Sequence, residues 1–230
     1  MSYCRELGWR DPLDLPDPSD LPDPSDLPDP LNAPTTPVTC VESFATLREL
    51  AASIDGCDRC ALAKRRKKVV FGEGDPSAAL LFVGEGPGVE EDKSGRPFVG
   101  RSGQLLDRLI FALGLERQHV FITNVVKCRP PGNRDPKQEE VAACSAILDR
   151  QIELIKPSII VTLGKPAANR LLQTAKSMGS MRGRWTRHRG IPVLPLFHPA
   201  YLLRNPISKR ETWTDIKAIR AKLQEIDEEQ

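Results

Sequence analysis

The stretch Ala78-Ala-Leu-Leu-Phe-Val-Gly-Glu-Gly-Pro-Gly88 decides the fold, because a short apolar run ends abruptly at a glycine-rich turn. A wholly apolar run of this length is typical of a strand buried on both faces of a parallel sheet. Three further segments read as strands, and stretches with helical apolar spacing separate them. The predicted strands are 78–83, 120–126, 158–163 and 192–197.

The helices are predicted from their apolar spacing and their start signals. Asp135 is read as a cap, followed by Pro136 at the first helical position and by Gln138 placed to complete a capping box. Strands that alternate with helices predict an α/β fold with a mainly parallel sheet covered on both faces. The predicted helices are 41–54, 103–113, 135 to about 156, 166–172 and 208–226.

The 230 residues divide by composition into an acidic leader, 1–40, and a single domain, 41–230. The leader repeats the hexapeptide DLPDPS from Asp14 and holds nine of the 21 prolines. Such a segment blocks helix and offers little to pack, so we expect an extended, disordered tail. A DNA-mimicking or partner-binding arm is the alternative.

Charge is distributed unevenly between these two parts. The leader has eight acids and two bases, whereas residues 41–230 have 31 bases and 23 acids, a net charge of +8. An excess of this sign favours a polyanionic partner. No apolar run approaches the roughly 20 residues that span a bilayer, and the N-terminus does not resemble a secretory signal. We therefore expect a cytosolic protein without a membrane span, in which cysteines remain thiols.

Polar residues follow three of the predicted strands at the point where each strand ends. Glu85 and its flanking glycines follow the first strand, Asn124 ends the second, and His198 follows the fourth. These ends meet at one edge of a parallel sheet, so we expect a ligand site there. A dinucleotide-binding turn is a competing interpretation of the glycines, but Pro87 interrupts the motif and the acids after it would repel a pyrophosphate. A mere tight turn would leave those acids unexplained.

Four cysteines form a second constellation. Cys57 and Cys60 are a C-x2-C pair in a polar turn, and Cys128 and Cys144 are separated by fifteen residues. Four thiolates can complete a zinc site or a cubane iron-sulfur cluster, and the spacing does not choose between them. Four separate buried thiols are the remaining alternative.

Four motifs together resemble those of the family 4 uracil-DNA glycosylases. They are 84–92 (GEGPGVEED), 95–100 (GRPFVG), 122–131 (ITNVVKCRPP) and 198–206 (HPAYLLRNP). The similarity runs in the expected order from about residue 51 to 220, and the leader departs from it. The resemblance implies a three-layer α/β/α fold with a four-stranded, mainly parallel sheet. It also implies a DNA repair enzyme that removes uracil from DNA, leaving an abasic site, with a 4Fe-4S cluster on Cys57, Cys60, Cys128 and Cys144.

Asn124 is our candidate for reading the base. A carboxamide can donate to uracil O4 and accept the N3 proton, whereas cytosine reverses that pattern; an asparagine that merely caps the strand is the alternative. By the resemblance, Phe98 stacks on the extruded ring. Gly86 and Gly88 have no side chains, so their backbone amides can approach the base closely.

Catalysis needs a hydrogen-bond donor that stabilises the leaving uracil. It also needs a carboxylate near the sugar. The resemblance positions His198 to stabilise negative charge on uracil O2. A carboxylate can stabilise a sugar cation and orient water. Because the family motif has Gly86 where the best-known uracil glycosylases have an aspartate, this role stays open among Glu85, Glu91 and a water held by Asn133.

Two other classes of protein compete with the interpretation as an enzyme that turns over uracil-containing DNA. A covalent uracil-DNA binder of the same superfamily carries a histidine-bearing basic insertion after the acidic segment; here residues 92–95 pass straight to Arg96, which favours turnover. A redox protein would use the cluster for electron transfer and would not excise uracil.

We expect a monomer that acts on single- or double-stranded DNA containing uracil. Basic residues outside the pocket are predicted to neutralise phosphates, and an apolar tip is predicted to wedge the gap left by the base. The candidates are the basic run 64–68, Arg182, Arg184, Arg187 and Arg189 for phosphates, and Leu202 or Leu203 for the wedge.

Overall fold

The computed structural model describes residues 44–228, so the predicted leader 1–40 and the start of the helix predicted over 41–54 lie outside the described residues. Over the described range the chain forms eight α-helices and six strands. The strands are β1 (Glu73–Gly74), β2 (Leu80–Gly84), β3 (Phe121–Asn124), β4 (Ile159–Leu163), β5 (Thr186–His188) and β6 (Ile191–Leu196). The helices are α1 (Leu47–Ser53), α2 (Val89–Ser94), α3 (Arg101–Ala112), α4 (Gln138–Ile155), α5 (Lys165–Leu172), α6 (Met178–Met181), α7 (Pro199–Arg204) and α8 (Lys209–Glu228).

The strands form a single mixed sheet in the order β1-β3-β2-β4-β6-β5. The four central strands are those predicted from the sequence, and they pair in parallel. β1 and β5 add an antiparallel strand at each edge. These edge strands have two and three residues, too few for an alternating pattern to be recognised in the sequence. The predicted α/β class with a mainly parallel sheet is confirmed.

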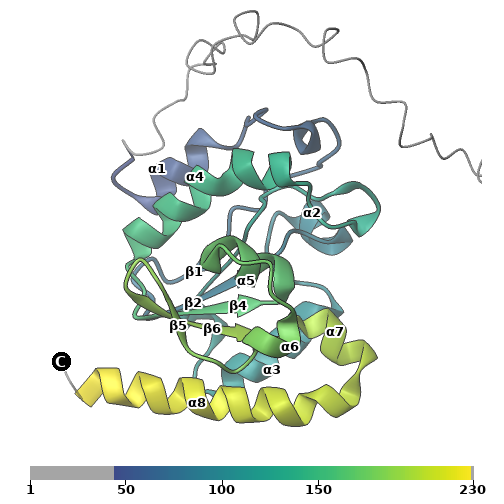
Figure 1. Cartoon of the computed structure of the whole chain (residues 1–230). Helices are drawn as coiled ribbons and strands as arrows, with labels where there is room; N and C mark the ends of the chain where they lie inside the picture. Colours follow the sequence, from purple (N-terminus) through teal and green to yellow (C-terminus); the bar gives the residue numbers. More distant parts are fainter. Residues whose placement is uncertain (1–43, 229–230) are drawn as a thin grey trace, which may run out of the picture. The chain divides into compact units, whose positions relative to one another are not determined.

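Helices cover both faces of the sheet (Figure 1). On β2, Leu81 and Val83 belong to the apolar core that includes residues of α4 and α5. Leu80 and Phe82 face the opposite core, which includes residues of α3 and α8. Every residue of β2 is buried, as the apolar run predicts for a central parallel strand. The result is three layers, with α1 packed against α4 outside the first face.

The topology opens a crevice at the carboxyl ends of the central strands. From β2 the chain moves to β3 on one side and then crosses to β4 on the other, and ligands bind at such a reversal. Pairing continues past the end of β3, where the amide of Val125 donates to Gly84 O at 2.9 Å and that of Val126 donates to Glu85 O at 3.1 Å. This pairing sets Asn124 directly opposite Gly84.

The predicted cap of α4 at Asp135 is wrong, because the N-cap lies two residues later. Its N-cap is Lys137, whose backbone amide donates to the carboxylate of Glu140 at 2.8 Å. Glu140 is buried, and Arg134 donates to both of its carboxylate oxygens, at 2.8 and 2.6 Å. This network around buried Glu140 stabilises a helix that begins at Gln138, so Asp135 lies before the helix and does not cap it.

Across residues 44–228, none of the helices combines the length and the apolar character that crossing a membrane requires.

Candidate active site at the carboxyl ends of the sheet

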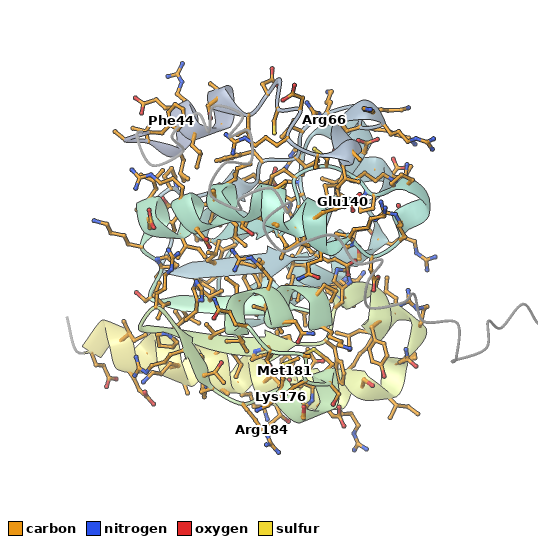
Figure 2. The ribbon with its side chains drawn as sticks, turned by 45° about the horizontal axis from the view of Figure 1, so that its top comes forward. Phe44, Arg66, Glu140, Lys176, Met181 and Arg184 are labelled. Atoms are coloured by element: carbon orange, nitrogen blue, oxygen red, sulfur yellow. The ribbon has the colours of Figure 1, made fainter. Side chains whose placement is uncertain are left out.

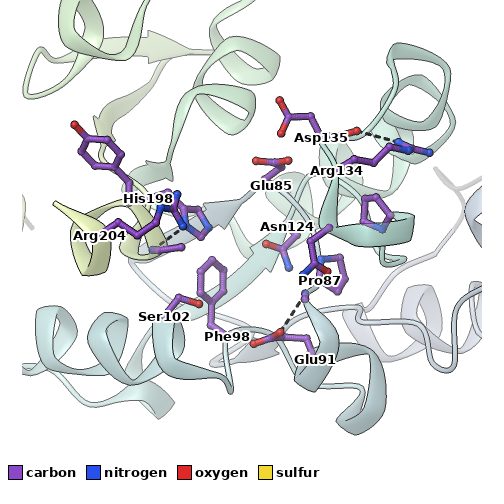
Figure 3. A pocket seen from close by; sticks show the side chains of 16 residues that line it. Glu85, Pro87, Glu91, Phe98, Ser102, Asn124, Arg134, Asp135, His198 and Arg204 are labelled. Carbon is purple, nitrogen blue, oxygen red and sulfur yellow. Dashed lines mark hydrogen bonds between the residues drawn. The ribbon is translucent and has the colours of Figure 1, made fainter.

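A cavity of about 420 Å³ lies where the central strands end (Figure 3). All eight predicted pocket residues line it: Glu85, Gly86, Gly88, Glu91, Phe98, Asn124, Asn133 and His198. Segments far apart in the sequence therefore meet here, as expected for a site at a topological reversal. Further lining residues to which the sequence analysis gave no role in this pocket include Ser102, Arg134, Asp135, Tyr201 and Arg204.

Asn124 presents an unused acceptor to this cavity. The residue is 1% exposed, and its side-chain oxygen Oδ1 has no hydrogen-bond partner among residues 44–228. An unpaired buried polar atom costs roughly 1–3 kcal/mol, so natural proteins keep few of them. A ligand with a donor at this position would satisfy the atom.

Gly84, which was not among the predicted site residues, lies opposite Asn124 at the end of β2. A Cβ atom at this position would lie 2.4 Å from Asn124 Oδ1 and 2.5 Å from Phe98 Cζ. Only glycine leaves room for the amide and the ring together. Its place directly after an apolar run was the signal available in the sequence.

Phe98 is both a core residue and a wall of the cavity. It is 5% exposed and packs with the α3 and α8 side of the sheet, while its ring lies 5.7 Å from the His198 ring at 32°. Its backbone has φ of +49°, a conformation that costs energy for a residue other than glycine. Arg117 donates to its carbonyl at 3.2 Å and so helps to hold this loop. The ring is thereby presented as a rigid apolar platform.

Glu91 uses its carboxylate to hold the backbone around the cavity. Oε1 accepts from the amides of Val99 at 2.9 Å and Gly100 at 3.0 Å, and Oε2 accepts from that of Gly88 at 3.1 Å. These bonds cap α2 and fasten the loop that carries Phe98 to it. With three backbone donors bound, the carboxylate is committed to shaping the site.

Glu85 is the other candidate carboxylate, and it lies half-buried just after β2. Asp135 lines the same cavity, and Figure 3 shows the carboxyl groups of Glu85 and Asp135 near one another. Burial, followed by the negative charge of Asp135, raises the pKa of Glu85 to about 7. A carboxyl with this pKa can exchange a proton near neutral pH.

His198 follows β6, as predicted, and it is the N-cap of α7. Its ring nitrogen Nδ1 accepts from the amide of Ala200 at 3.1 Å, and Pro199 occupies the first helical position. Because Nδ1 is an acceptor, the proton of the neutral ring is on Nε2. Burial, and secondarily the charge of Arg204, lowers the pKa of His198 to about 4. The ring therefore offers a neutral N–H donor at this wall of the cavity.

Asn133 and Gly86 line the cavity through different groups. The side-chain oxygen of Asn133 accepts from Arg129 Nε at 2.8 Å. The backbone amide of Asn133 donates to Pro130 O at 3.1 Å. At Gly86, a Cβ atom would lie 2.8 Å from a methyl carbon of Val126. The close approach of these two segments thus requires glycine at this position.

The four predicted cysteine ligands line a second cavity, between α4 and the segment that follows α1. Cys128 and Cys144 are buried, and Cys57 and Cys60 are partly exposed. The other lining residues are the cations Arg59, Arg66 and Lys127 and the apolar residues Ile54, Val69, Ala143 and Ile147. The structure thus brings together all four cysteines from three separate segments.

The donor set of this cavity fits an iron-sulfur cluster, in which each of four thiolates binds a different iron. Among residues 44–228, no three His, Cys, Asp or Glu side chains are grouped to hold one metal ion. Arg66 donates to Cys128 Sγ at 3.6 Å, and the positive residues around the cavity suit a centre with several thiolates.

Several basic residues that were predicted to contact DNA form hydrogen bonds or ion pairs within the domain. Arg66 points into the cysteine cavity, Arg182 pairs with Asp215 at 2.7 Å, and Arg189 pairs with Glu153 at 3.0 Å. Each of these cations neutralises or orders a neighbour within the domain. Arg184 remains exposed, and Figure 2 shows it and Arg66 on opposite sides of the sheet.

The predicted wedge is corrected in one respect. Leu202 is fully buried and cannot serve as an apolar tip, because the segment forms α7 and that face packs inward. Tyr201 and Leu203 are each 37% exposed on the same helix. Tyr201 also stacks on Phe197, with ring centroids 4.8 Å apart.

Comparisons with known proteins agree with this geometry. The sequence profile of the uracil DNA glycosylase superfamily matches residues 71–217. A type-4 uracil-DNA glycosylase of Sulfurisphaera tokodaii is 46% identical over 184 residues, which cover 76% of this chain and 84% of that protein. The type-4 uracil-DNA glycosylase of Thermotoga maritima is 51% identical over 153 residues, or 65% of this chain and 79% of that protein. A type-5 uracil-DNA glycosylase of Pyrobaculum aerophilum is 34% identical over 146 residues, or 56% and 64% of the two chains.

The α/β/α fold, a cavity at the sheet's carboxyl edge and the profile match place this chain in the uracil-DNA glycosylase superfamily. Within it, the chain belongs to the type-4 uracil-DNA glycosylases, with which it shares close to half of the aligned residues. The resemblance stated from the four motifs is confirmed.

Proposed function

We propose that this chain removes uracil from DNA by hydrolysing the bond between C1′ of the sugar and N1 of the base, leaving an abasic site. Its membership in the type-4 uracil-DNA glycosylases supports the reaction class. The observation that carries the proposal is the unpartnered, buried Oδ1 of Asn124 in a cavity of about 420 Å³.

Recognition of the base follows from that atom. Oδ1 of Asn124 accepts the N3 proton of uracil, and its NH2 group donates to O4. Cytosine has an acceptor at N3 and an amino group at C4, so it would oppose both groups of the amide. The Phe98 ring stacks on the flipped base, since aromatic platforms bind an extruded pyrimidine through its π-face.

His198 assists departure of the base. When the C1′–N1 bond breaks, its electron pair leaves with uracil and the charge spreads onto O2. A neutral imidazole N–H in a preorganised site stabilises that oxygen without transferring a proton. The lowered pKa of His198 and the acceptor role of Nδ1 support this neutral donor.

Glu85 serves the sugar side of the reaction. Its ionised carboxylate orients a water molecule toward C1′ and favours the developing sugar cation. The water oxygen bonds to C1′ and its proton passes to Glu85, so the products are an abasic sugar and a uracil anion that solvent protonates. Glu91 holds the backbone of the pocket through its three backbone donors. Asn133 borders the same cavity and limits where the water can lie.

We also propose that Cys57, Cys60, Cys128 and Cys144 hold a 4Fe-4S cluster. The convergence of the four cysteines on one cavity with three cations supports it. Such a centre would join the segment after α1 to the loop after β3 and to α4, which adds stability that the thiols alone lack. The substrate is single- or double-stranded DNA containing uracil, and the protein acts as a monomer.

The experiment is incubation of the purified protein with an end-labelled oligonucleotide that contains one uracil, followed by hot alkali. Strand cleavage at the uracil, with none in matched oligonucleotides carrying cytosine or thymine, is the expected result. An intact strand contradicts the proposal. A gel shift that survives denaturation identifies a covalent binder instead, and reversible reduction without excision identifies a redox protein.

A further inference from the structure

Asp135 and Glu85 form a pair of carboxyl groups at the cavity. Asp135 lies between the turn Pro131–Asn133 and α4, and it lines the same cavity as Glu85. Figure 3 shows the two carboxyls near one another at the edge of the pocket. Two ionised carboxylates at close range repel each other, and a proton on one of them removes the repulsion and allows a hydrogen bond between them.

The different burial of the two groups decides where the proton lies. Asp135 is exposed, whereas Glu85 is half-buried. Burial disfavours the charged form of a carboxyl, so the proton is held by Glu85 and donated toward Asp135. The raised pKa of Glu85, about 7, has burial as its first cause and the charge of Asp135 as its second.

The chain around Asp135 keeps its carboxylate available for this contact. The guanidinium of Arg134 is bound to Glu140 at 2.6 and 2.8 Å, and it also donates to the backbone carbonyl of Asp135 at 2.9 Å. The neighbouring cation is therefore paired, and the backbone of Asp135 is held. Because α4 starts at Gln138, Asp135 is also free of the capping role expected from its sequence.

The other ionisable groups that line the cavity come from α2, from the segment before α4 and from α7: Glu91, Arg134, His198, Tyr201 and Arg204. Glu91 is held by three backbone amides, and His198 is neutral above about pH 4. Asp135 is therefore the group whose charge acts on Glu85 directly.

We propose that Asp135 is a positioning residue of this glycosylase: it shares one proton with Glu85 and holds the Glu85 carboxyl toward the cavity. The inference rests on the proposed function, in which ionised Glu85 orients the water. Asp135 then sets the pH above which excision reaches its full rate. At lower pH the proton stays on Glu85, which can no longer accept a hydrogen bond from the water through that oxygen.

Asp135→Asn tests this through the pH profile of single-turnover excision under saturating enzyme. The variant removes a negative charge and offers an NH2 donor to ionised Glu85, both of which favour ionisation. The acidic limb of the pH–rate profile should move to lower pH by about one unit. The rate on the plateau of that profile should change by less than about threefold. Asp135→Glu should keep the limb near its original pH. Glu139→Gln removes an exposed carboxylate four residues away and should not move the limb.

A second measurement does not depend on activity. With glutamate labelled by carbon-13 at the carboxyl, Glu85 can be titrated by NMR and assigned from the signal lost in Glu85→Gln. Asp135→Asn should lower its titration midpoint. An unchanged midpoint overturns the carboxyl pair, whatever the enzyme excises. A midpoint that moves while the rate profile does not contradicts the role of Glu85 in the proposed function and, with it, the positioning role of Asp135.

Discussion

The uracil cavity and the cysteine cavity share one short segment of chain but are built in different ways. Asn124 ends β3 and faces the first, while Cys128, four residues later, lines the second. The first is positioned by sheet pairing between Gly84 and Asn124, and the second by loops and one helix. A pocket on a sheet should keep its shape when one side chain changes, whereas a loop site should depend on what its side chains bind.

Lys127 connects the two regions. Its buried Nζ donates to the carbonyl of Asn124 at 2.6 Å, to Gln151 Oε1 at 2.6 Å and to Thr123 Oγ1 at 2.8 Å. The same side chain lines the cysteine cavity. Disorder in the loops around the cysteines would therefore reach the pocket through the end of β3.

The largest effect is expected at His198, inside the uracil cavity. His198→Ala removes the neutral donor to uracil O2, and an oxyanion donor of this kind contributes about 10² to 10³ in rate. Ground-state uracil has little charge at O2, so affinity for uracil-containing DNA should change much less. Single-turnover excision and equilibrium binding measure the two effects separately.

His119→Ala is the matched control for this variant. His119 Nδ1 also accepts a backbone amide, that of Glu116 at 3.2 Å, but the residue is exposed and lies outside the uracil cavity. Its rate should stay near that of the unaltered protein. A large loss of binding with an unchanged cleavage rate in His198→Ala would show that His198 positions DNA.

A smaller effect on catalysis is expected at Cys57, in the cysteine cavity. Cys57→Ala should lower the iron and acid-labile sulfide content and speed hydrogen exchange in residues 55–70 by about tenfold or more, because metal binding is coupled to local folding. Excision should fall less than in His198→Ala.

Cys40→Ala is the control, since this cysteine is not among the four predicted ligands.

The unaltered protein should be brown after purification, because the proposed iron-sulfur cluster absorbs visible light. Stoichiometric zinc without acid-labile sulfide, in protein prepared anaerobically, would refute the cluster and leave the uracil pocket unaffected.

Much of the sheet could be predicted because a strand that is buried on both faces has a nearly continuous apolar sequence. Residues 78–83 and 158–163 are uninterrupted or nearly uninterrupted apolar runs, and both became central parallel strands. Asn124, Phe98 and His198 reach one cavity because strand ends meet at one edge.

Other features depend on contacts that no local pattern contains. Asp135 satisfied the rule for a cap, yet the ion pair of Arg134 with buried Glu140 stabilises a later helix start. The carboxyl pair of Asp135 with Glu85 joins residues 50 positions apart in the sequence. At His198, by contrast, Pro199 was a readable signal for the start of α7, since proline is common at the first helical position.

The central claim is that the unpartnered amide oxygen of Asn124 reads uracil, and Asn124→Asp tests it most directly. An aspartate lacks the donor to O4 and faces that oxygen with an acceptor instead. Single-turnover excision of uracil should fall by about 10² or more, and weak action on cytosine can appear. Asn169→Asp is the matched control, because Asn169 also has a buried Oδ1 without a partner among residues 44–228 but lies outside the cavity. It should excise uracil at nearly the original rate. Excision by Asn124→Asp at the rate of the unaltered protein would contradict the account.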